Sequence, residues 1–187
     1  RSVSRASLSL VAEGSGLPPA PGALYVDVEA VNNSGAEDAM RRGPGEGSVA
    51  EAIARRGLPL DSLTLSVDPR PEEIAAALER GRGRDIVVGV YSASGHPTQL
   101  ELVRALARQA AATGTKLGLV SMRSPYDAAP LLAAAAPLAP AVLCAYEYTA
   151  LSAGSVADHL SGTVRAGGRC PVAALPGDVI HNVSRRS

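Results

Sequence analysis

The side chains best suited to chemistry in this sequence follow short apolar runs. Arg123, Tyr126 and Asp127 come directly after the run 117–122, and Glu147 follows a run that starts at Ala141. Ligands and partners of α/β proteins bind where parallel strands end. A guanidinium, a phenol and carboxylates at such positions could therefore contact a polar ligand or take part in acid–base chemistry.

Ser92, Ser94 and His96 lie in the loop after a third run, 85–91. The residues predicted to face a ligand or cleft are therefore Ser92, Ser94, His96, Arg123, Tyr126, Asp127 and Glu147. Each also has a structural alternative. Arg123 and Asp127 would fix a loop and the start of a helix, His96 would be a surface histidine, and Glu147 would be a solvated acid.

The remaining reactive residues show no spacing typical of a catalytic or metal site. The histidines at 96, 159 and 181 lack ligand spacing, and Cys144 and Cys170 lie in apolar contexts that favour buried free thiols. The glycine–arginine stretch 81–84 precedes a strand, whereas a phosphate loop precedes a helix. The prediction is that this chain holds no catalytic residue, metal or cofactor of its own.

Composition narrows the class of protein. The chain has 187 residues, of which 46% are hydrophobic, and a formal net charge of zero. Its aromatic residues, 3% of the total, are all tyrosine. A neutral, aromatic-poor chain is not expected to bind nucleic acid. The sequence shows neither a membrane span nor a signal peptide. Its basic residues are almost all arginine and alanine is abundant, a bias typical of GC-rich bacteria. The location is left open, with a bacterial cytoplasm favoured. The first residue is not Met, and a piece of a longer protein is expected.

Strand and helix signals alternate along the chain. Strands are predicted at 23–28, 63–67, 85–91, 117–122 and 141–146. Two helices are predicted with both ends, one from the cap Ser48 to Gly57 and one from Pro71 to Gly81. Others are predicted after a capping box of Thr98 and Glu101, after the cap Ser124, and at Ser152 or Ser155. Residues 32–47 are predicted to be a mobile loop.

This alternation predicts an α/β fold: a three-layer, doubly wound, mostly parallel sheet of five to six strands with the flavodoxin-like order 2-1-3-4-5. The runs 85–91 and 117–122 should be central because they are apolar on both faces. The proline-bearing run 170–175 predicts an antiparallel edge strand near the C-terminus, and residues 7–11 form either an edge strand or a linker. The predicted organisation is a lead-in strand and linker at 1–22, one domain at 23–177 and a tail at 178–187.

Four strings in fixed order carry a family resemblance. They are 85–93 with Gln99 and the helical segment 102–106 behind it, then RSPYD at 123–127, AYEYT at 145–149 and GRCPV at 168–172. The set resembles the C-terminal α/β domain of glycoside hydrolase family 3. It is nearest to the bacterial β-N-acetylhexosaminidase branch, where R-N-P-Y-D, Y-G-Y-T and G-R-L-P-V-T recur in this order. Residues 1–19 also look like that family's lead-in segment.

The resemblance implies that catalysis belongs to a preceding barrel domain. In that family the Asp nucleophile lies in the barrel, and in hexosaminidase-type members the His acid/base lies there too. Some branches take an acid from the C-terminal domain, which keeps Glu147 as a candidate. This sequence departs from the family pattern because Ser92 and Ser124 replace the usual Asn, and Glu147 replaces the usual Gly.

The predicted function is therefore that of an accessory domain in a β-N-acetylhexosaminidase or β-glucosidase. Its partner would be an N-terminal TIM barrel of the same protein, and carbohydrate would be reached only through that barrel. Tyr146 and Tyr148, on the opposite side of a strand from Glu147, are predicted at the domain interface, and the isolated fragment could self-associate. The alternatives are a stand-alone flavodoxin-like module for a small anionic ligand and a purely structural module.

Overall fold

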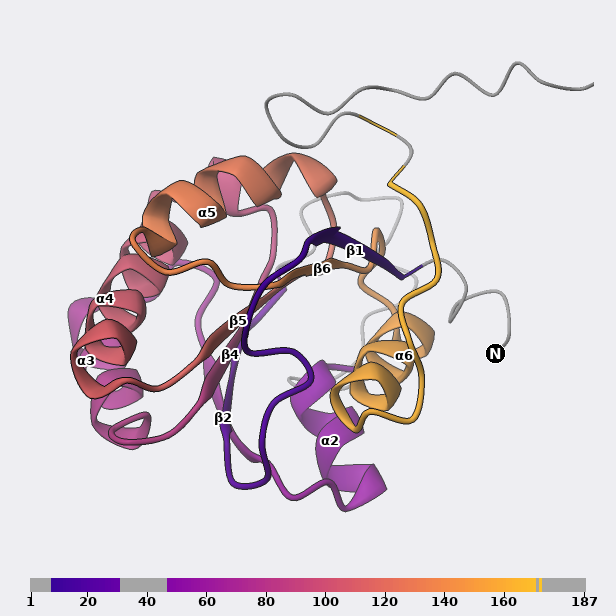
Figure 1. Cartoon of the computed structure of the whole chain (residues 1–187), viewed down its shortest axis with the longest axis horizontal. Helices are drawn as coiled ribbons and strands as arrows, with labels where there is room; N and C mark the ends of the chain where they lie inside the picture. The colour runs from indigo at the N-terminus through magenta and orange to yellow at the C-terminus, as the bar shows by residue number, and fades with distance from the viewer. Residues whose placement is uncertain (1–7, 31–46, 171, 173–187) are drawn as a thin grey trace, which may run out of the picture.

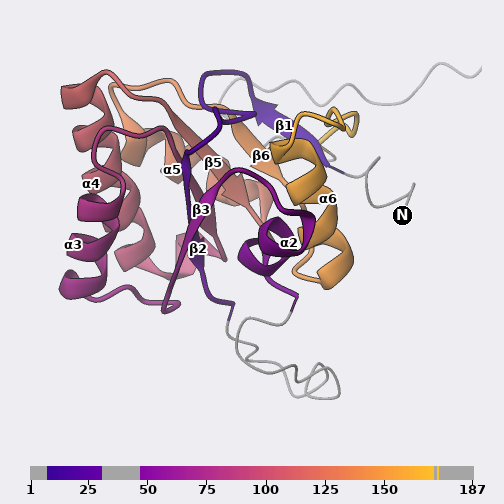
Figure 2. The same ribbon diagram turned by 90° about the horizontal axis from the view of Figure 1, so that it is seen from below.

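The computed structural model describes residues 8–30, 47–170 and 172. A sheet forms the middle layer, with α3, α4 and α5 on one face and α2 and α6 on the other (Figure 1). Figure 2 shows the same three layers from below. In chain order the elements are β1 (Ser9–Ala12), β2 (Leu24–Val28), α2 (Val49–Arg56), β3 (Asp61–Leu65), α3 (Pro71–Arg80), β4 (Ile86–Val90), η2 (Ala93–Gly95), α4 (Pro97–Thr113), β5 (Leu117–Ser121), η3 (Pro125–Asp127), α5 (Ala128–Ala135), β6 (Val142–Cys144) and α6 (Ala150–Leu160).

The strand order confirms the predicted topology. The order β1-β6-β5-β4-β2-β3 contains the five predicted strands in the arrangement 2-1-3-4-5, and all five run parallel. β4 and β5 are central, as their apolarity on both faces predicts. The parallel strands all end at one edge of the sheet, which we call the carboxyl edge. From β2 the chain crosses to β3 on one side, and from β4 it crosses to β5 on the other side. A topological switch point therefore lies between β2 and β4.

Two hydrophobic cores explain why the central strands are apolar throughout. Val88 of β4 packs with Leu102 and Leu106 of α4 in the core beneath α3, α4 and α5. Val87, one residue earlier, faces the opposite way and packs in the core with Ile53 of α2 and Val156 of α6. Successive strand residues point to opposite faces, so each position in β4 belongs to one core or the other.

The antiparallel edge strand comes from the N-terminal side of the chain. β1 pairs with β6 in antiparallel register, Ser9 opposite Cys144. The sequence placed the antiparallel strand near the C-terminus instead, at 170–175. Most of that run lies outside the described residues. Gly168, just before it, forms a parallel bridge with Ser9.

The segment after β1 is bound to the sheet along its length. Ser15 accepts a hydrogen bond from the Ala141 N–H at 2.8 Å and donates its own N–H to the Ala139 carbonyl at 3.1 Å. Gly16 has φ +88°, and a Cβ there would lie 2.3 Å from the Leu117 carbonyl carbon. Only glycine fits such a close approach of two backbones. Residues 13–16, which read as linker in the sequence, therefore pack against the sheet.

Two helices begin and end as predicted. The Ser48 side chain accepts from the Glu51 N–H at the start of α2, and Gly57 ends the helix in the left-handed conformation. Pro71 opens α3, and the Glu73 carboxylate accepts from the Arg70 N–H at 2.9 Å. That carboxylate also accepts from the Ser66 N–H at 3.0 Å, and these bonds lower the pKa of Glu73 to about 2.

Other boundaries differ from the prediction. The capping box of Thr98 and Glu101 is wrong: α4 begins at Pro97, and the Thr98 hydroxyl donates to Asp68 at 3.2 Å instead. The last helix begins earlier than Ser152 because Thr149 caps it, accepting from the Ser152 N–H at 3.2 Å. β3 lies two residues before the predicted run, and β6 is a shorter strand than predicted.

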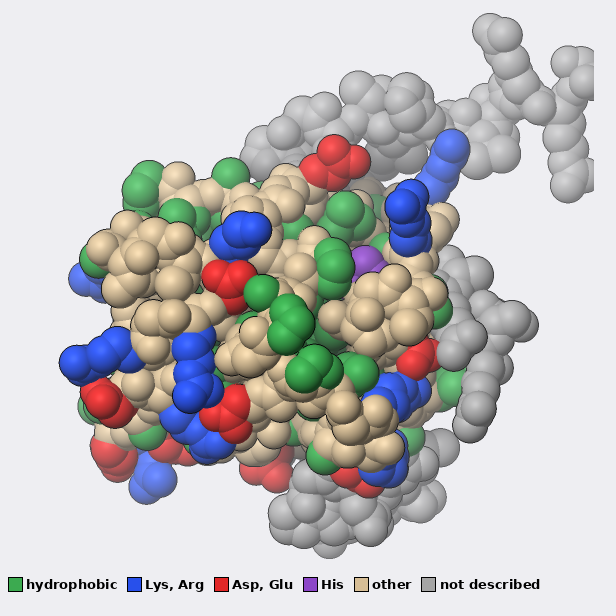
Figure 3. All heavy atoms as spheres, turned by 60° about the horizontal axis from the view of Figure 1, so that its bottom comes forward, with side chains coloured by type: hydrophobic (Ala, Val, Ile, Leu, Met, Phe, Trp, Pro, Cys, Tyr) green, Lys and Arg blue, Asp and Glu red, His purple; other side chains and the backbone are tan. Residues whose placement is uncertain are grey.

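Oppositely charged side chains are interleaved on the face shown in Figure 3, around a central group of hydrophobic ones. Several surface charges form ion pairs: Asp61 lies 2.6 Å from Arg80 and 3.1 Å from Arg84. Arg82 lies 2.7 Å from Glu79.

The predicted loop at 32–47, except residue 47, and the predicted tail lie outside the described residues. Among the helices of the described ranges, none is long and apolar enough to span a membrane.

Candidate functional site

The predicted site residues all lie in the loops at the carboxyl edge. Ser92, Ser94 and His96 follow β4, the group at 123–127 follows β5, and the group at 146–148 follows β6. The shared parallel direction of these three neighbouring strands brings the three loops to one edge. That edge is the candidate functional site.

A buried glutamine fixes the β4 end of this site. The Gln99 side chain accepts from the Tyr91 N–H at 3.0 Å and donates to the Tyr91 carbonyl at 3.0 Å. It also donates to the Val67 carbonyl, after β3, at 2.8 Å. Gln99 thereby joins the ends of β3 and β4 and sets the position of the Tyr91 ring.

Arg123 is held by tyrosine and not by an acid. Its Nη1 donates to the Tyr91 hydroxyl at 2.6 Å, and its Cζ lies 5.4 Å from the Tyr91 ring centroid. The Tyr91 ring meets Tyr148 edge-on, with centroids 5.5 Å apart and an interplanar angle of 77°. Arg123 and Asp127, which were expected as the structural alternative to fix a loop and a helix start, have different partners and do not contact each other. Arg123 itself remains exposed.

Asp127 points into the protein. It is fully buried, and its Oδ1 accepts from both the N–H and the hydroxyl of Ser94, the N–H at 3.0 Å. Its Oδ2 accepts from the Ser121 hydroxyl at 3.1 Å. The carboxylate thus ties the loop after β4 to the loop after β5. Asp127 makes no side-chain bond to the helix start that the sequence assigned to it.

His96 has a partner that the sequence did not suggest. Its Nδ1 lies 2.9 Å from Oδ1 of Asp68, in the loop after β3. That oxygen also accepts from the Thr98 hydroxyl. The only sequence signal for this pairing was that the loops after β3 and β4 both follow parallel strands and so lie at the same edge of the sheet.

The residues at 146–148 lie outside any strand, since β6 ends at Cys144. The expected alternation of Tyr146 and Tyr148 against Glu147 therefore does not apply. Glu147 is exposed, and its Oε2 accepts from the Ser152 hydroxyl at 3.4 Å. The Tyr146 hydroxyl is buried beside Ser9 and Cys170, and burial raises the pKa of Tyr146.

Two residues here adopt backbone conformations that favour glycine. Ser92 has φ +52° and Tyr146 has φ +62°, and they are the non-glycine residues with positive φ in the described ranges. They follow β4 and β6, on either side of the end of β5. Such strain costs roughly 1–3 kcal/mol per residue and is concentrated at functional sites. Its occurrence here supports this edge as the site.

Asp27 in β2 is a buried acid that sequence reasoning passed over. Its side chain is on the α2 and α6 side of the sheet and is 1% exposed. Oδ2 accepts from the Ala50 N–H at 2.9 Å, while Oδ1 has no hydrogen-bond partner among the described residues. Burial raises the pKa of Asp27 to about 6, against the opposing effects of the Ala50 N–H, the Ser48 hydroxyl and the Val49 N–H. The one available signal was an acid within an apolar strand pattern.

The described residues form neither a metal site nor a reactive thiol. Over residues 8–30, 47–170 and 172, no group of three or more His, Cys, Asp or Glu side chains is placed to hold a metal ion. Both cysteines are free; Cys144 is buried and Cys170 half-buried. Burial raises the pKa of the Cys144 thiol to about 12, so at neutral pH it is protonated and a poor nucleophile.

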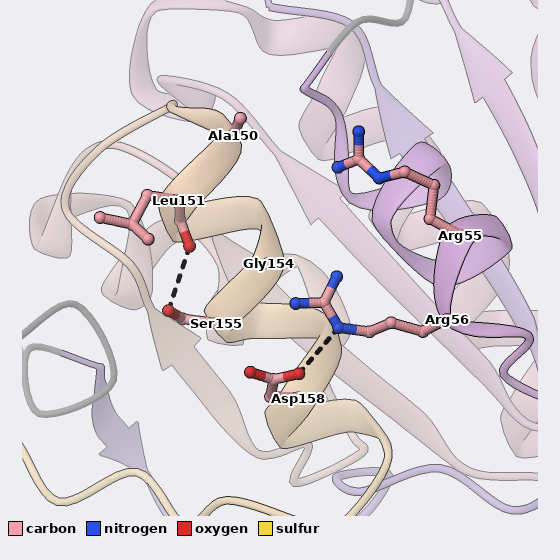
Figure 4. Close-up of a pocket in the computed structure, with 7 residues that line it drawn as sticks. All are labelled: Arg55, Arg56, Ala150, Leu151, Gly154, Ser155 and Asp158. Atoms are coloured by element: carbon pink, nitrogen blue, oxygen red, sulfur yellow. Dashed lines mark hydrogen bonds and ion pairs between the residues drawn. The ribbon is translucent and has the colours of Figure 1, made fainter. Parts of the chain in front are cut away.

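A separate hollow lies between α2 and α6 (Figure 4). Its volume is about 600 Å³, and Arg56 crosses it to reach Asp158, with Nε 2.7 Å from Oδ1. Gly154 allows this crossing, because a Cβ there would lie 2.9 Å from the Arg56 guanidinium. Arg55, also at the rim, pairs with Glu51. The arginines of this hollow are thus neutralised by carboxylates, and the carboxyl edge is the stronger candidate.

Comparisons with known proteins identify where this fold occurs. Neither a protein-family model nor a curated protein matches the sequence. Among solved structures, a glycoside hydrolase family 3 β-N-acetylglucosaminidase from Paenibacillus sp. str. FPU-7 matches 92% of this chain with TM-score 0.75 and 25% identity. A β-glucosidase of saponin metabolism from intestinal bacteria matches 91% with TM-score 0.64 and 16% identity. A Listeria innocua β-glucosidase in complex with isofagomine matches 86% with TM-score 0.61 and 16% identity.

The matched region is a minor part of each enzyme. It covers 31% of the Paenibacillus chain, 32% of the intestinal β-glucosidase and 24% of the Listeria enzyme. These values are those of one domain in a larger protein. They agree with the resemblance that the sequence strings show.

Proposed function

Because this chain has the fold of the C-terminal α/β domain of glycoside hydrolase family 3, we propose that it is the accessory domain of such a hydrolase, of β-N-acetylhexosaminidase or β-glucosidase type. It packs on a catalytic barrel and reaches carbohydrate only through that barrel. The observation that carries the proposal is the match of 92% of this chain to 31% of a β-N-acetylglucosaminidase. A cytoplasmic bacterial location and a role in carbohydrate metabolism belong to the same proposal.

The acids at the carboxyl edge support an accessory role. Glycoside hydrolysis needs two groups on either side of the bond, with carboxyls about 5–5.5 Å apart for retention or about 6.5–9.5 Å for inversion. Asp127 is buried and bonded to Ser94 and Ser121, so it is not available to a sugar. Glu147 is exposed, but the predicted site residues include no second accessible acid that could act with it. We therefore expect no hydrolysis by this chain alone.

The test compares two proteins on the same substrates. The chain alone and the chain joined to the polypeptide encoded upstream of Arg1 are incubated with chromogenic β-N-acetylglucosaminide and β-glucoside. Activity is expected only in the longer protein. The control is Glu147→Gln in both: unchanged activity is expected, since the two catalytic groups are assigned to the barrel.

Two results would contradict the proposal. Turnover by the chain alone that disappears in Glu147→Gln would make Glu147 catalytic and this chain an enzyme. An upstream coding region without a barrel would favour a stand-alone ligand-binding or structural module.

A further inference from the structure

Aromatic residues are concentrated at the carboxyl edge. The chain has five tyrosines and neither Phe nor Trp. Tyr25 lies in β2, and the other four follow β4, β5 and β6: Tyr91, Tyr126, Tyr146 and Tyr148. Tyr126 is 61% exposed, while Tyr91 and Tyr148 pack against each other. Tyrosine and arginine are enriched among the residues that dominate binding energy at protein interfaces.

Among the arginines of the described ranges, Arg123 is the one that lies over an aromatic ring. Like Arg104, Arg108, Arg165 and Arg169, it forms no ion pair with the described residues. Arg55, Arg56, Arg70, Arg80, Arg82 and Arg84 all form ion pairs with carboxylates. Arg123 has no acid within ion-pair distance among the described residues, and its Nη1 is bonded to the Tyr91 hydroxyl. Its Nε and Nη2 groups make no hydrogen bond to the described part of the chain.

The Tyr91 contacts prepare Arg123 for binding. A free arginine side chain loses conformational entropy when it is fixed in a complex. Here the hydrogen bond and the adjacent ring already restrict the guanidinium, and Gln99 and Tyr148 in turn hold Tyr91. An exposed, ordered guanidinium with unused donors matches a carboxylate, which it can bind through two parallel hydrogen bonds.

We propose that Arg123 anchors this domain to its catalytic barrel by binding a carboxylate side chain on the barrel surface, with the exposed Tyr126 packing beside it. This inference rests on the proposed function. The length of the matched enzymes supports a protein as the occupant, since 69% of the Paenibacillus chain (100 − 31) lies outside the matched region. A net charge of zero in this chain means that the contact depends on this local charge and not on general attraction.

The test measures association of two separate polypeptides. This chain and the barrel encoded upstream of Arg1 are purified, and their Kd is measured by calorimetry at low and high salt. Arg123→Gln should weaken binding about ten-fold or more and reduce its salt dependence. Arg123→Lys keeps the charge but not the planar fork, so it should remain weakened. Tyr91→Phe keeps the ring and removes the hydroxyl that orients Arg123, and its loss should be intermediate.

The matched control is Arg104→Gln, which removes an exposed arginine on α4 and should leave Kd unchanged. Circular dichroism melts of each variant alone check folding, and the Arg123 variants should melt like the wild type because the side chain is exposed. These controls separate lost docking from lost structure.

The outcomes separate a failure of the proposed function from a failure of the Arg123 anchor alone. If the wild-type chain does not bind the barrel, the proposed function fails. If the wild type binds and Arg123→Gln binds equally well, only the anchor is overturned. A changed KM for the chromogenic sugar with unchanged association would assign Arg123 to the substrate and also overturn it. So would an Arg123-dependent dimer of this chain that the barrel fails to dissociate.

Discussion

Two fully buried carboxylates near the ends of parallel strands differ in how their oxygens are satisfied. Both oxygens of Asp127 accept hydrogen bonds, from Ser94 and Ser121. Asp27 accepts from Ala50 through Oδ2 only, and its Oδ1 lacks a partner among the described residues. A buried charge without full hydrogen bonding is costly, so Asp27 should take up a proton more readily than an ordinary acid.

Asp27 should make the protein less stable as pH rises. Burial raises its folded-state pKa from 3.8 to about 6. The folded state therefore binds the proton more tightly than the unfolded state. The resulting stabilisation is complete below pH 3.8 and is lost as pH rises through about 6. The loss amounts to about 3 kcal/mol between these limits. Asp27→Asn removes the titration, so its stability relative to wild type should increase with pH.

The measurement is urea unfolding of both proteins from pH 4 to pH 8. Glu29, Tyr25 and Tyr148 also influence this region, and they are present in both proteins, so their effects largely cancel in the difference. Glu101→Gln, an exposed acid on α4, is the control and should run parallel to the wild type. A difference between Asp27→Asn and wild type that does not change with pH would show that Asp27 titrates normally.

At the scale of elements, helix starts depend on short-range hydrogen bonds that the sequence partly displays. Ser124 was expected to cap a helix directly. In the structure its Oγ accepts from the Tyr126 N–H at 3.3 Å, and it caps the short turn η3 that precedes α5. The cap type was recognised correctly, while the element that it begins is a single 3₁₀ turn.

Ser124→Ala should therefore lower stability by about 0.5–1 kcal/mol, at the lower end for an N-cap. The bond is long, and the residue is only partly buried. Thr149→Ala, at the cap of the eleven-residue helix α6, provides the comparison and should cost about 1 kcal/mol. Both are measured by urea unfolding at neutral pH. Equal stability of Ser124→Ala and wild type would show that this bond contributes nothing.

At the scale of the whole molecule, residues 8–17 pack against the sheet and its core. Leu8 is fully buried in the core beneath α2 and α6, and β1 pairs with β6. The sequence divided the chain at residue 22 into a lead-in and a domain. A chain that starts at Ala23 would lose Leu8, the β1 ladder and the backbone contacts of Ser15.

Removal of residues 1–22 should lower the free energy of unfolding by several kcal/mol, since burying a leucine side chain alone is worth about 2 kcal/mol. It should also expose the β6 edge, and an unpaired edge promotes association with other chains. Thermal melting and sedimentation of the truncated and full chains test both effects. A truncated monomer with unchanged stability would support the boundary at residue 22.

The sequence by itself determined the order of the parallel strands and the two central ones. Apolar runs with helix signals between them allow few topologies, because crossover connections are right-handed and short. It also identified the helix ends whose signals are local, such as Ser48 with Gly57 and Pro71 with Gly81. The RSPYD, AYEYT and GRCPV strings pointed to the family whose enzymes the structure then matched.

Only the tertiary structure decided which polar side chains meet. Arg123 contacts Tyr91, 32 residues away, and His96 contacts Asp68, 28 residues away. Asp127 points inward because Ser94 and Ser121 are placed around it by neighbouring strands. Partners of this kind are set by strand register and loop packing, to which sequence spacing gives no guide. The same holds for β1, because an edge strand can pair on either side of a sheet with little local preference, and the position of its partner β6 settles the choice.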